Sequence, residues 1–221
     1  MAPKIIVSYD DTDNDRDALE LGRVLASSGG ALSLAYVRHG ALTEPGRERL
    51  AQEQAEALLD HGAELLGNPN VPKHIIVNAS TGVGLAELAA SEGADIVVFG
   101  SDYRTARGAV IPGKTAEHLL GNGSVAVALA PADFRSRPTT KIARIGVIAE
   151  GDTAPEETAK SLAGALGASL TANDGPVDLM VVGSRNGAPS GRTEIGALAE
   201  YHIETANAPV LVLPRDTPIA F

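Results

Sequence analysis

The sequence contains no cysteine and no tryptophan, and aromatic residues fill only 3% of its 221 positions. The lack of cysteine excludes disulfide bonds, thiolate metal sites and cysteine nucleophiles. Because aromatic residues are scarce, a core must be built from Val, Leu, Ile and Ala. The hydrophobic fraction of 44% is sufficient for such a core and is typical of globular proteins.

Positive charge and long apolar runs are also lacking. The chain has 18 Lys and Arg against 28 Asp and Glu, and both residues 1–138 (12 basic, 18 acidic) and residues 139–221 (6 basic, 10 acidic) are acidic. Nucleic-acid binding is therefore not expected, because it needs a basic face. No apolar run approaches the ~20 residues that cross a bilayer, and the N-terminus shows no signal-peptide pattern. The sequence predicts a cytoplasmic protein without a membrane partner.

Short apolar runs alternate with segments of helical periodicity. The runs that are typical of buried parallel strands cover residues 5–9, 31–37, 74–78, 95–99 and 125–129. Helices are expected over about 18–25, 44–66, 84–91 and 115–120. Asp13, Asp15 and Asp17 are expected in the first turn of the first helix, where acidic residues complement the helix dipole. This alternation predicts a doubly wound α/β fold with a parallel five-stranded sheet.

The later part of the chain repeats the earlier part. Residues 94–133 align with residues 177–216 without a gap, at an offset of 83, with 11 identities in 40 positions. The apolar run at 144–150 instead parallels residues 4–10, at an offset of 140. The second copy therefore lacks 57 residues, which fall after its second strand at 168–171.

Two domains follow from this repeat. We expect the first over residues 1–135 and a reduced second copy of the same fold, with about four strands and two helices, over residues 139–221. The segment at 131–138 has the composition of a linker.

The segment after the fourth apolar run carries spaced glycines. It reads Gly100-Ser-Asp-Tyr103, then nine residues, then Gly113-Lys114-Thr115. With the apolar strand that ends in Asp10, this resembles the universal stress protein family, whose nucleotide-binding members carry Gly-x2-Gly-x9-Gly-(Ser/Thr) here. The second copy keeps the spacing, and the middle glycine is replaced in both copies, by Tyr103 and Asn186.

The resemblance implies an adenine-nucleotide alpha-hydrolase-like fold with strand order 3-2-1-4-5. Under that order the 57 missing residues remove an edge strand, which a sheet can lose without breaking its other ladders. The resemblance also implies that two domains of this family pair with each other through their fifth strands. Residues 125–129 and 210–213 could then pair within one chain as an internal pseudo-dimer, and a homodimer is left open.

The resemblance further implies that the first domain binds ATP or another adenine nucleotide, with Mg²⁺ as an accompanying ion. Asp10 would bind ribose or a metal-bridged phosphate, and Val37 would touch the base. The full set of implied binding residues is Asp10, Val37, Gly100, Gly113, Lys114 and Thr115. The loop itself suits phosphate, because it joins the carboxyl end of a parallel strand to a helix N-terminus. Arg104, Arg107 and Lys114 add positive charge to it.

The matching loop of the second copy and a P-loop-like stretch are weaker indications of nucleotide binding than the first-domain signature. Glu150, Asn186 and Ala197 stand at the matching positions of the second copy, so we expect that copy to support the architecture without binding nucleotide. Residues 108–115 match the P-loop pattern, but their first glycine does not directly follow a strand.

The sequence contains no catalytic constellation, so we expect at most slow ATP hydrolysis. The function expected is that of a stress-response or regulatory protein. The alternative is a family member that binds no nucleotide and acts through protein contacts, which Tyr103 and Asn186 favour.

Overall fold

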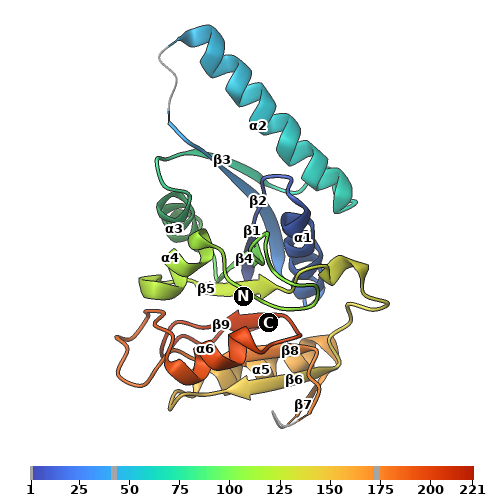
Figure 1. The fold of residues 1–221 in the computed structure, drawn as a ribbon, viewed down its shortest axis with the longest axis vertical. Helices are drawn as coiled ribbons and strands as arrows, with labels where there is room; N and C mark the ends of the chain where they lie inside the picture. The colour runs from blue at the N-terminus through green and yellow to red at the C-terminus, as the bar shows by residue number, and fades with distance from the viewer. Residues whose placement is uncertain (1, 41–43, 172–174) are drawn as a thin grey trace.

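The computed structural model describes residues 2–40, 44–171 and 175–221, which form an α/β fold (Figure 1). The N-terminal part, up to residue 138, contains β1 (Lys4–Ser8), α1 (Asp13–Ala26), β2 (Ala31–Arg38), α2 (Pro45–Leu65), β3 (Lys73–Val77), α3 (Thr81–Glu92), β4 (Ile96–Gly100), α4 (Lys114–Asn122), β5 (Ala126–Ala130) and η1 (Phe134–Ser136). The C-terminal part, residues 139–221, contains β6 (Arg144–Ile148), α5 (Ala154–Leu166), β7 (Ser169–Leu170), β8 (Leu179–Val182), α6 (Ala197–Glu204) and β9 (Val210–Val212).

The strands of the described chain form one sheet in the order β3-β2-β1-β4-β5-β9-β8-β6-β7. Neighbours within each part are parallel, as the alternation of strands and helices predicts. The N-terminal part has the order 3-2-1-4-5 that the family resemblance implies. In the C-terminal part, β7 occupies the edge, with no described counterpart of β3 beyond it.

The two parts meet through β5 and β9, which pair antiparallel. The register joins Val127 to Val212, Ala128 to Leu211 and Leu129 to Val210, and all six side chains are fully buried. These strands lie in the segments 125–129 and 210–213, for which the family resemblance implies pairing within one chain. The pairing makes a single continuous sheet out of the two parts.

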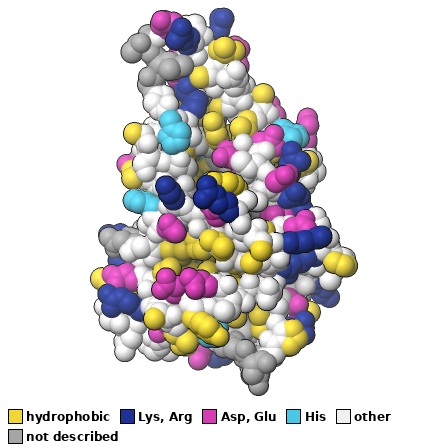
Figure 2. Space-filling view, viewed as in Figure 1, with side chains coloured by type: hydrophobic (Ala, Val, Ile, Leu, Met, Phe, Trp, Pro, Cys, Tyr) yellow, Lys and Arg dark blue, Asp and Glu magenta, His cyan; other side chains and the backbone are white. Residues whose placement is uncertain are grey.

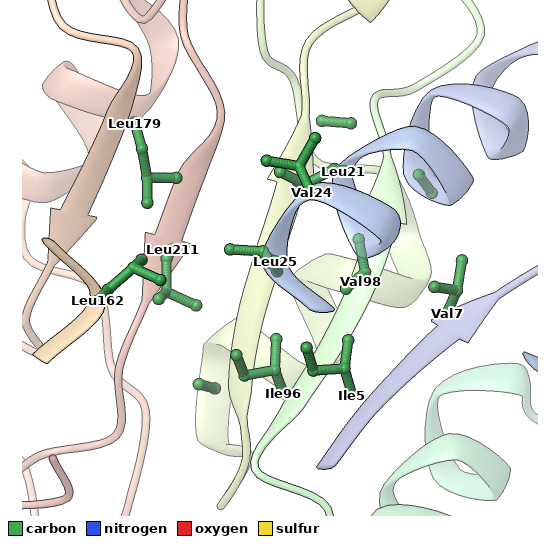
Figure 3. Close-up of a cluster of buried hydrophobic side chains, with 14 of the residues drawn as sticks. Ile5, Val7, Leu21, Val24, Leu25, Ile96, Val98, Leu162, Leu179 and Leu211 are labelled. Carbon is green, nitrogen blue, oxygen red and sulfur yellow. The ribbon is translucent and has the colours of Figure 1, made fainter. Parts of the chain in front are cut away.

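Alternate residues of these strands point to opposite faces of the sheet, and each face carries its own hydrophobic cluster. Helices α1, α2 and α5 cover one face, and α3, α4 and α6 cover the other. Figure 3 shows Leu25 of α1 and Leu162 of α5 on the same side of the sheet, near β5 and Leu211 of β9. Both clusters therefore extend across the junction between the two parts.

Asp17 lies one turn further along α1 than the sequence predicts, because Thr12 caps the helix and only Asp13 and Asp15 lie in its first turn. The Asp17 side chain is 1% exposed, and its carboxylate accepts hydrogen bonds from the amides of Asp133 (2.7 Å) and Arg135 (2.9 Å). The segment at 131–138, which has the composition of a linker, is thus anchored to α1. In the C-terminal part, Asp152 accepts in the same way from the amide of Asp216 (3.0 Å).

Asp17 also pairs with the guanidinium of Arg135 (3.2 Å). We expect Asp17→Ala to lower the free energy of unfolding by about 2–4 kcal/mol, because this guanidinium and the two amides lose a buried acceptor. Asp13→Ala is the matched control, since Asp13 also pairs with Arg135 (3.2 Å) but is 82% exposed. The control should change stability by less than about 1 kcal/mol. Urea unfolding measures both, and equal effects would show that Asp17 does not hold this segment.

Candidate functional site

Five of the six predicted binding residues lie at the carboxyl ends of the central strands of the sheet. Asp10 follows β1, and Gly100 ends β4, the neighbour of β1. A bridge between Ser101 and Pro112 returns the intervening loop to β4. Gly113 is the N-cap of α4, and Lys114 and Thr115 begin that helix. The structure therefore brings an acidic residue, a lysine and a helix N-terminus to the carboxyl ends of two central strands, the usual ligand position in such sheets.

Val37, the sixth residue, is placed differently. It lies near the carboxyl end of β2, but its side chain is only 5% exposed. It belongs to the hydrophobic cluster under α3, together with Leu85 and Ala89 of that helix. The Val37 side chain is thus part of the core and is not presented at the edge of the sheet.

The loop between β4 and α4 is held by Ser101, whose role the sequence analysis did not identify. Its hydroxyl donates to the carbonyl of Ala130 (2.7 Å) and accepts from the amide of Ile111 (3.4 Å). Ser184, 83 positions later, donates to Leu213 (2.8 Å) and accepts from Glu194 (3.2 Å) in the same pattern. The identity of Ser101 and Ser184 in the repeat was the available signal.

Gly100 allows α1 to approach β4 closely. A Cβ atom at Gly100 would lie 2.1 Å from the backbone oxygen of Asn14, whose side-chain amide also donates to the carbonyl of Ser101 (2.7 Å). A Cβ atom at Gly113 would meet no atom within 4 Å. Of the two predicted site glycines, Gly100 has a packing role and Gly113 leaves open space at the start of α4. Gly108, the first glycine of the P-loop pattern, donates its amide to the carbonyl of Ala132, which follows β5 (2.8 Å).

The first turns of α4 and α6 differ in how their amide groups are satisfied. In α6, the Oε1 atom of Glu150 accepts a hydrogen bond from the amide of Ala199, the third residue of the helix (3.2 Å). The equivalent residue of α4 is Ala116, and among the described residues no side-chain acceptor contacts it. Helix N-termini attract anions through these free amides and the helix dipole. The C-terminal part thus places its own carboxylate where α4 leaves room for an external anion.

Asp10, which corresponds to Glu150 in the repeat, stays within its own turn. Its carboxylate accepts from the amide of Thr12 (3.3 Å), and its amide donates to Asp15 (3.0 Å). Glutamate is one methylene longer than aspartate, and Glu150 also has a left-handed backbone with φ of 50°. The shorter side chain at position 10 leaves the helix opposite it uncapped.

The basic residues of the loop are not equivalent. Arg107 forms an ion pair with Asp133, and Arg104 stacks over the ring of Tyr103, 4.8 Å from its centre. Tyr103 itself is 74% exposed. Lys114 is exposed and has no ion-pair partner in the described chain. Lys114 is therefore the cation beside the open N-terminus of α4 that is available to a ligand.

The acidic run after β1 caps α1. Thr12 and Asp15 form a reciprocal capping box, in which the Asp15 carboxylate accepts from the hydroxyl (2.7 Å) and amide (3.2 Å) of Thr12. Burial and the adjacent Asp10 carboxylate raise the pKa of Asp15 to about 8.

A second carboxylate, Asp11, contacts three neighbouring side chains through its Oδ1 atom. It accepts from the hydroxyl of Tyr9 (2.8 Å) and pairs with Arg16 and with His61 of α2 (both 3.2 Å). The hydrogen bond from Tyr9 lowers the pKa of Asp11, and burial raises the pKa of Tyr9. In the parts of the chain that the structure describes, no group of three or more His, Asp or Glu side chains is arranged to hold a metal ion.

Comparison with known proteins identifies the family. The sequence model of the Universal stress protein family matches residues 1–131, more than half of the chain. The chain belongs to the universal stress protein family. No curated protein matches the sequence. None of the helices in the described ranges is long and apolar enough to cross a membrane.

Solved structures of the family share the fold over nearly the whole chain. A universal stress protein from Archaeoglobus fulgidus is 16% identical, with a TM-score of 0.63, and the match covers 96% of this chain and 98% of that one. A putative universal stress protein from Pseudomonas aeruginosa is 17% identical, with a TM-score of 0.65, and the match covers 97% of this chain and 94% of that one. At these identities the likeness concerns the fold alone.

The two site glycines should respond differently to alanine. Gly100→Ala should lower the free energy of unfolding by about 2–4 kcal/mol, because the new methyl group collides with backbone that cannot turn aside. Gly113→Ala should change it by less than about 1 kcal/mol, since the space beside it is open. Thermal and urea unfolding of both variants provide the comparison. A mild effect at Gly100 would contradict the close approach of α1.

Titration of Asp15 should depend on Asp10. A folded-state pKa above the unfolded value of about 4 means that the folded chain binds more protons, so this carboxyl loses its stabilising effect as pH rises from about 4 to 8. In Asp10→Asn we expect the pKa of Asp15 to fall and this pH dependence to weaken, because the neighbouring negative charge is removed.

Carboxyl ¹³C NMR titration measures the pKa of Asp15 directly. Asp13→Asn, which removes an exposed charge from the same helical turn, should leave that pKa unchanged. A value for Asp15 that is the same in Asp10→Asn and the parent chain would mean that burial alone raises it.

Proposed function

We propose that this universal stress protein is a regulatory protein that binds one adenine nucleotide, ATP or AMP, in its N-terminal part. The observation that carries the proposal is the contrast between α4 and α6. The first turn of α6 is occupied by the carboxylate of Glu150 (3.2 Å), whereas the first turn of α4 is open and lies beside the unpaired Lys114. Anions are stabilised at such an open N-terminus.

The residues at the site suit a nucleotide. The amides at the start of α4 can donate to phosphate oxygens, with Lys114 and the Thr115 hydroxyl beside them, and Gly113 leaves that approach open. Asp10, on the neighbouring strand end, can accept from ribose hydroxyls or share a Mg²⁺ ion with the phosphates. When bound, the nucleotide would supply a signal, and we expect at most slow hydrolysis.

The C-terminal part is, in this proposal, a shortened second copy that supports the first and binds no nucleotide. Its loop from Gly183 to Gly196 repeats the hydrogen bonds of the first loop at the offset of 83. Its helix end is already capped by Glu150, and Ala197 stands where Lys114 stands in the first copy. We therefore expect one site per chain.

Tyr103 favours a second candidate function, in which the protein binds no nucleotide and acts through protein contacts. It replaces the glycine of the binding signature, and its large ring is exposed beside Arg104. Its backbone does not adopt the left-handed conformation that would require glycine. The substitution therefore leaves the loop unstrained, and only ligand titration separates the two functions.

Calorimetric titration of the full chain with ATP and Mg²⁺, and with AMP, tests the first function. Lys114→Ala should weaken binding about tenfold or more, as expected from the loss of one charge-assisted hydrogen bond to phosphate. Lys160→Ala, which removes an exposed lysine from α5, is the matched control and should leave the affinity unchanged.

The stoichiometry is equally informative. One nucleotide per chain agrees with the capped state of α6, and two would contradict it. Equal affinities of the parent chain and Lys114→Ala would move the nucleotide away from α4. No binding by the parent chain, with no nucleotide released on denaturation, would favour the function through protein contacts.

A further inference from the structure

A cavity with a volume of about 560 Å³ lies between the two parts of the chain, and its lining includes Pro112, the residue before Gly113 of the proposed nucleotide site. It is bordered by α4 and the end of the first loop on one side, and by α6 and the corresponding loop on the other. Ten of its lining positions form five pairs at the offset of 83, and Arg185 is the remaining lining residue. The pairs are 111 and 194, 112 and 195, 117 and 200, 120 and 203, and 121 and 204. The volume is in the range of small-molecule sites.

This pairing places the cavity on the pseudo-two-fold axis that relates the two copies across β5 and β9. Each wall presents the same helix face and the same loop position to the opening. The two walls of the cavity are chemically alike where the paired residues are identical, as for Glu117 and Glu200. It is asymmetric at Ile111 and Glu194, which occupy equivalent places.

Part of the cavity lining is apolar. Its apolar lining residues are Ile111, Pro112, Leu120, Ile195 and Ile203. Figure 2 shows hydrophobic side chains across the middle of this face of the molecule, with Asp and Glu side chains below them. Such a surface favours the aliphatic part of a ligand.

Carboxylates border this surface on both sides. Glu117 on α4 stands opposite Glu200 and Glu204 on α6, and in the described chain none of the three has an ion-pair partner. Glu194 is neutralised by its ion pair with Arg185. The cavity therefore has a net negative charge that is divided between two walls related by the pseudo-symmetry.

We propose that this cavity binds an elongated organic dication, an aliphatic di- or polyamine, across the pseudo-two-fold axis. One ammonium group lies against Glu117 and the other against Glu200 and Glu204, and the methylene chain covers the apolar lining. An anion is repelled by the three unpaired carboxylates, and a monocation satisfies only one wall. The cavity lies beside α4, so the ligand contacts the same helix that begins at Lys114.

The proposal is tested on the full chain with 1,8-diaminooctane in calorimetric titrations at low ionic strength. Octylamine keeps one ammonium group, and 1,8-octanediol keeps the length without charge. We expect the diamine to bind more tightly than either. Its affinity should fall as salt increases, because exposed ion pairs are screened.

Two variants locate the ligand. Glu117→Gln and Glu200→Gln should each weaken diamine binding by about threefold, and the double variant by about tenfold, as for exposed ion pairs. Glu92→Gln, which removes an exposed carboxylate at the end of α3, is the charge-matched control and should not change the affinity. All three side chains are exposed, so the variants should keep the thermal stability of the parent chain.

Three results would overturn the proposal. Equal diamine affinities of the double variant and the parent chain would exclude this cavity. Equal affinities of the diamine and octylamine would exclude a two-ended ligand. Absence of diamine binding, with self-association in sedimentation that the double variant abolishes, would make the cavity an interface between copies of this chain.

Discussion

The antiparallel pairing of β5 with β9 is the contact on which the rest of the structure depends. Its three residue pairs are fully buried, and they join two parallel sheets of opposite direction into one. Both hydrophobic clusters then extend across the junction, so the core is continuous between the two parts. The same pairing sets α4 and α6 on one face, where they form the two walls of the cavity.

The two helix ends at the carboxyl edge show how related segments acquire different chemistry. Both helices begin at a glycine that follows the same loop, and the loops share their serine-centred hydrogen bonds. A single methylene separates Asp10 from Glu150, yet the longer side chain reaches the amide of Ala199 and the shorter one stays in its own turn. Asp10 and Glu150 carry the same charge, and they differ in the reach of the side chain and in backbone conformation.

Most of the fold could be predicted from the sequence, because the apolar runs have strand length and the repeat is visible at a fixed offset. The strand order and the six candidate binding residues came from the family resemblance. The role of Asp17 could not be predicted, because its partners lie 116 and 118 residues away and only the fold brings them near. The apolar run at 31–37 indicates that Val37 is buried, but the packing of α3 against it depends on the fold. The capping of α6 by Glu150 likewise depends on a contact between segments 49 residues apart.

The link between the two parts, anchored by Asp17 through Asp133 and Arg135, has a consequence for variation. In a dimer of identical chains, every substitution appears on both sides of the axis at once, so an interface can accept only changes that suit both. A single chain that contains both sides is free of this restriction. One part can then cap a helix end with its own carboxylate while the other part leaves the matching end open, and Ile111 can face Glu194 across a cavity that a symmetric dimer would line with two identical residues.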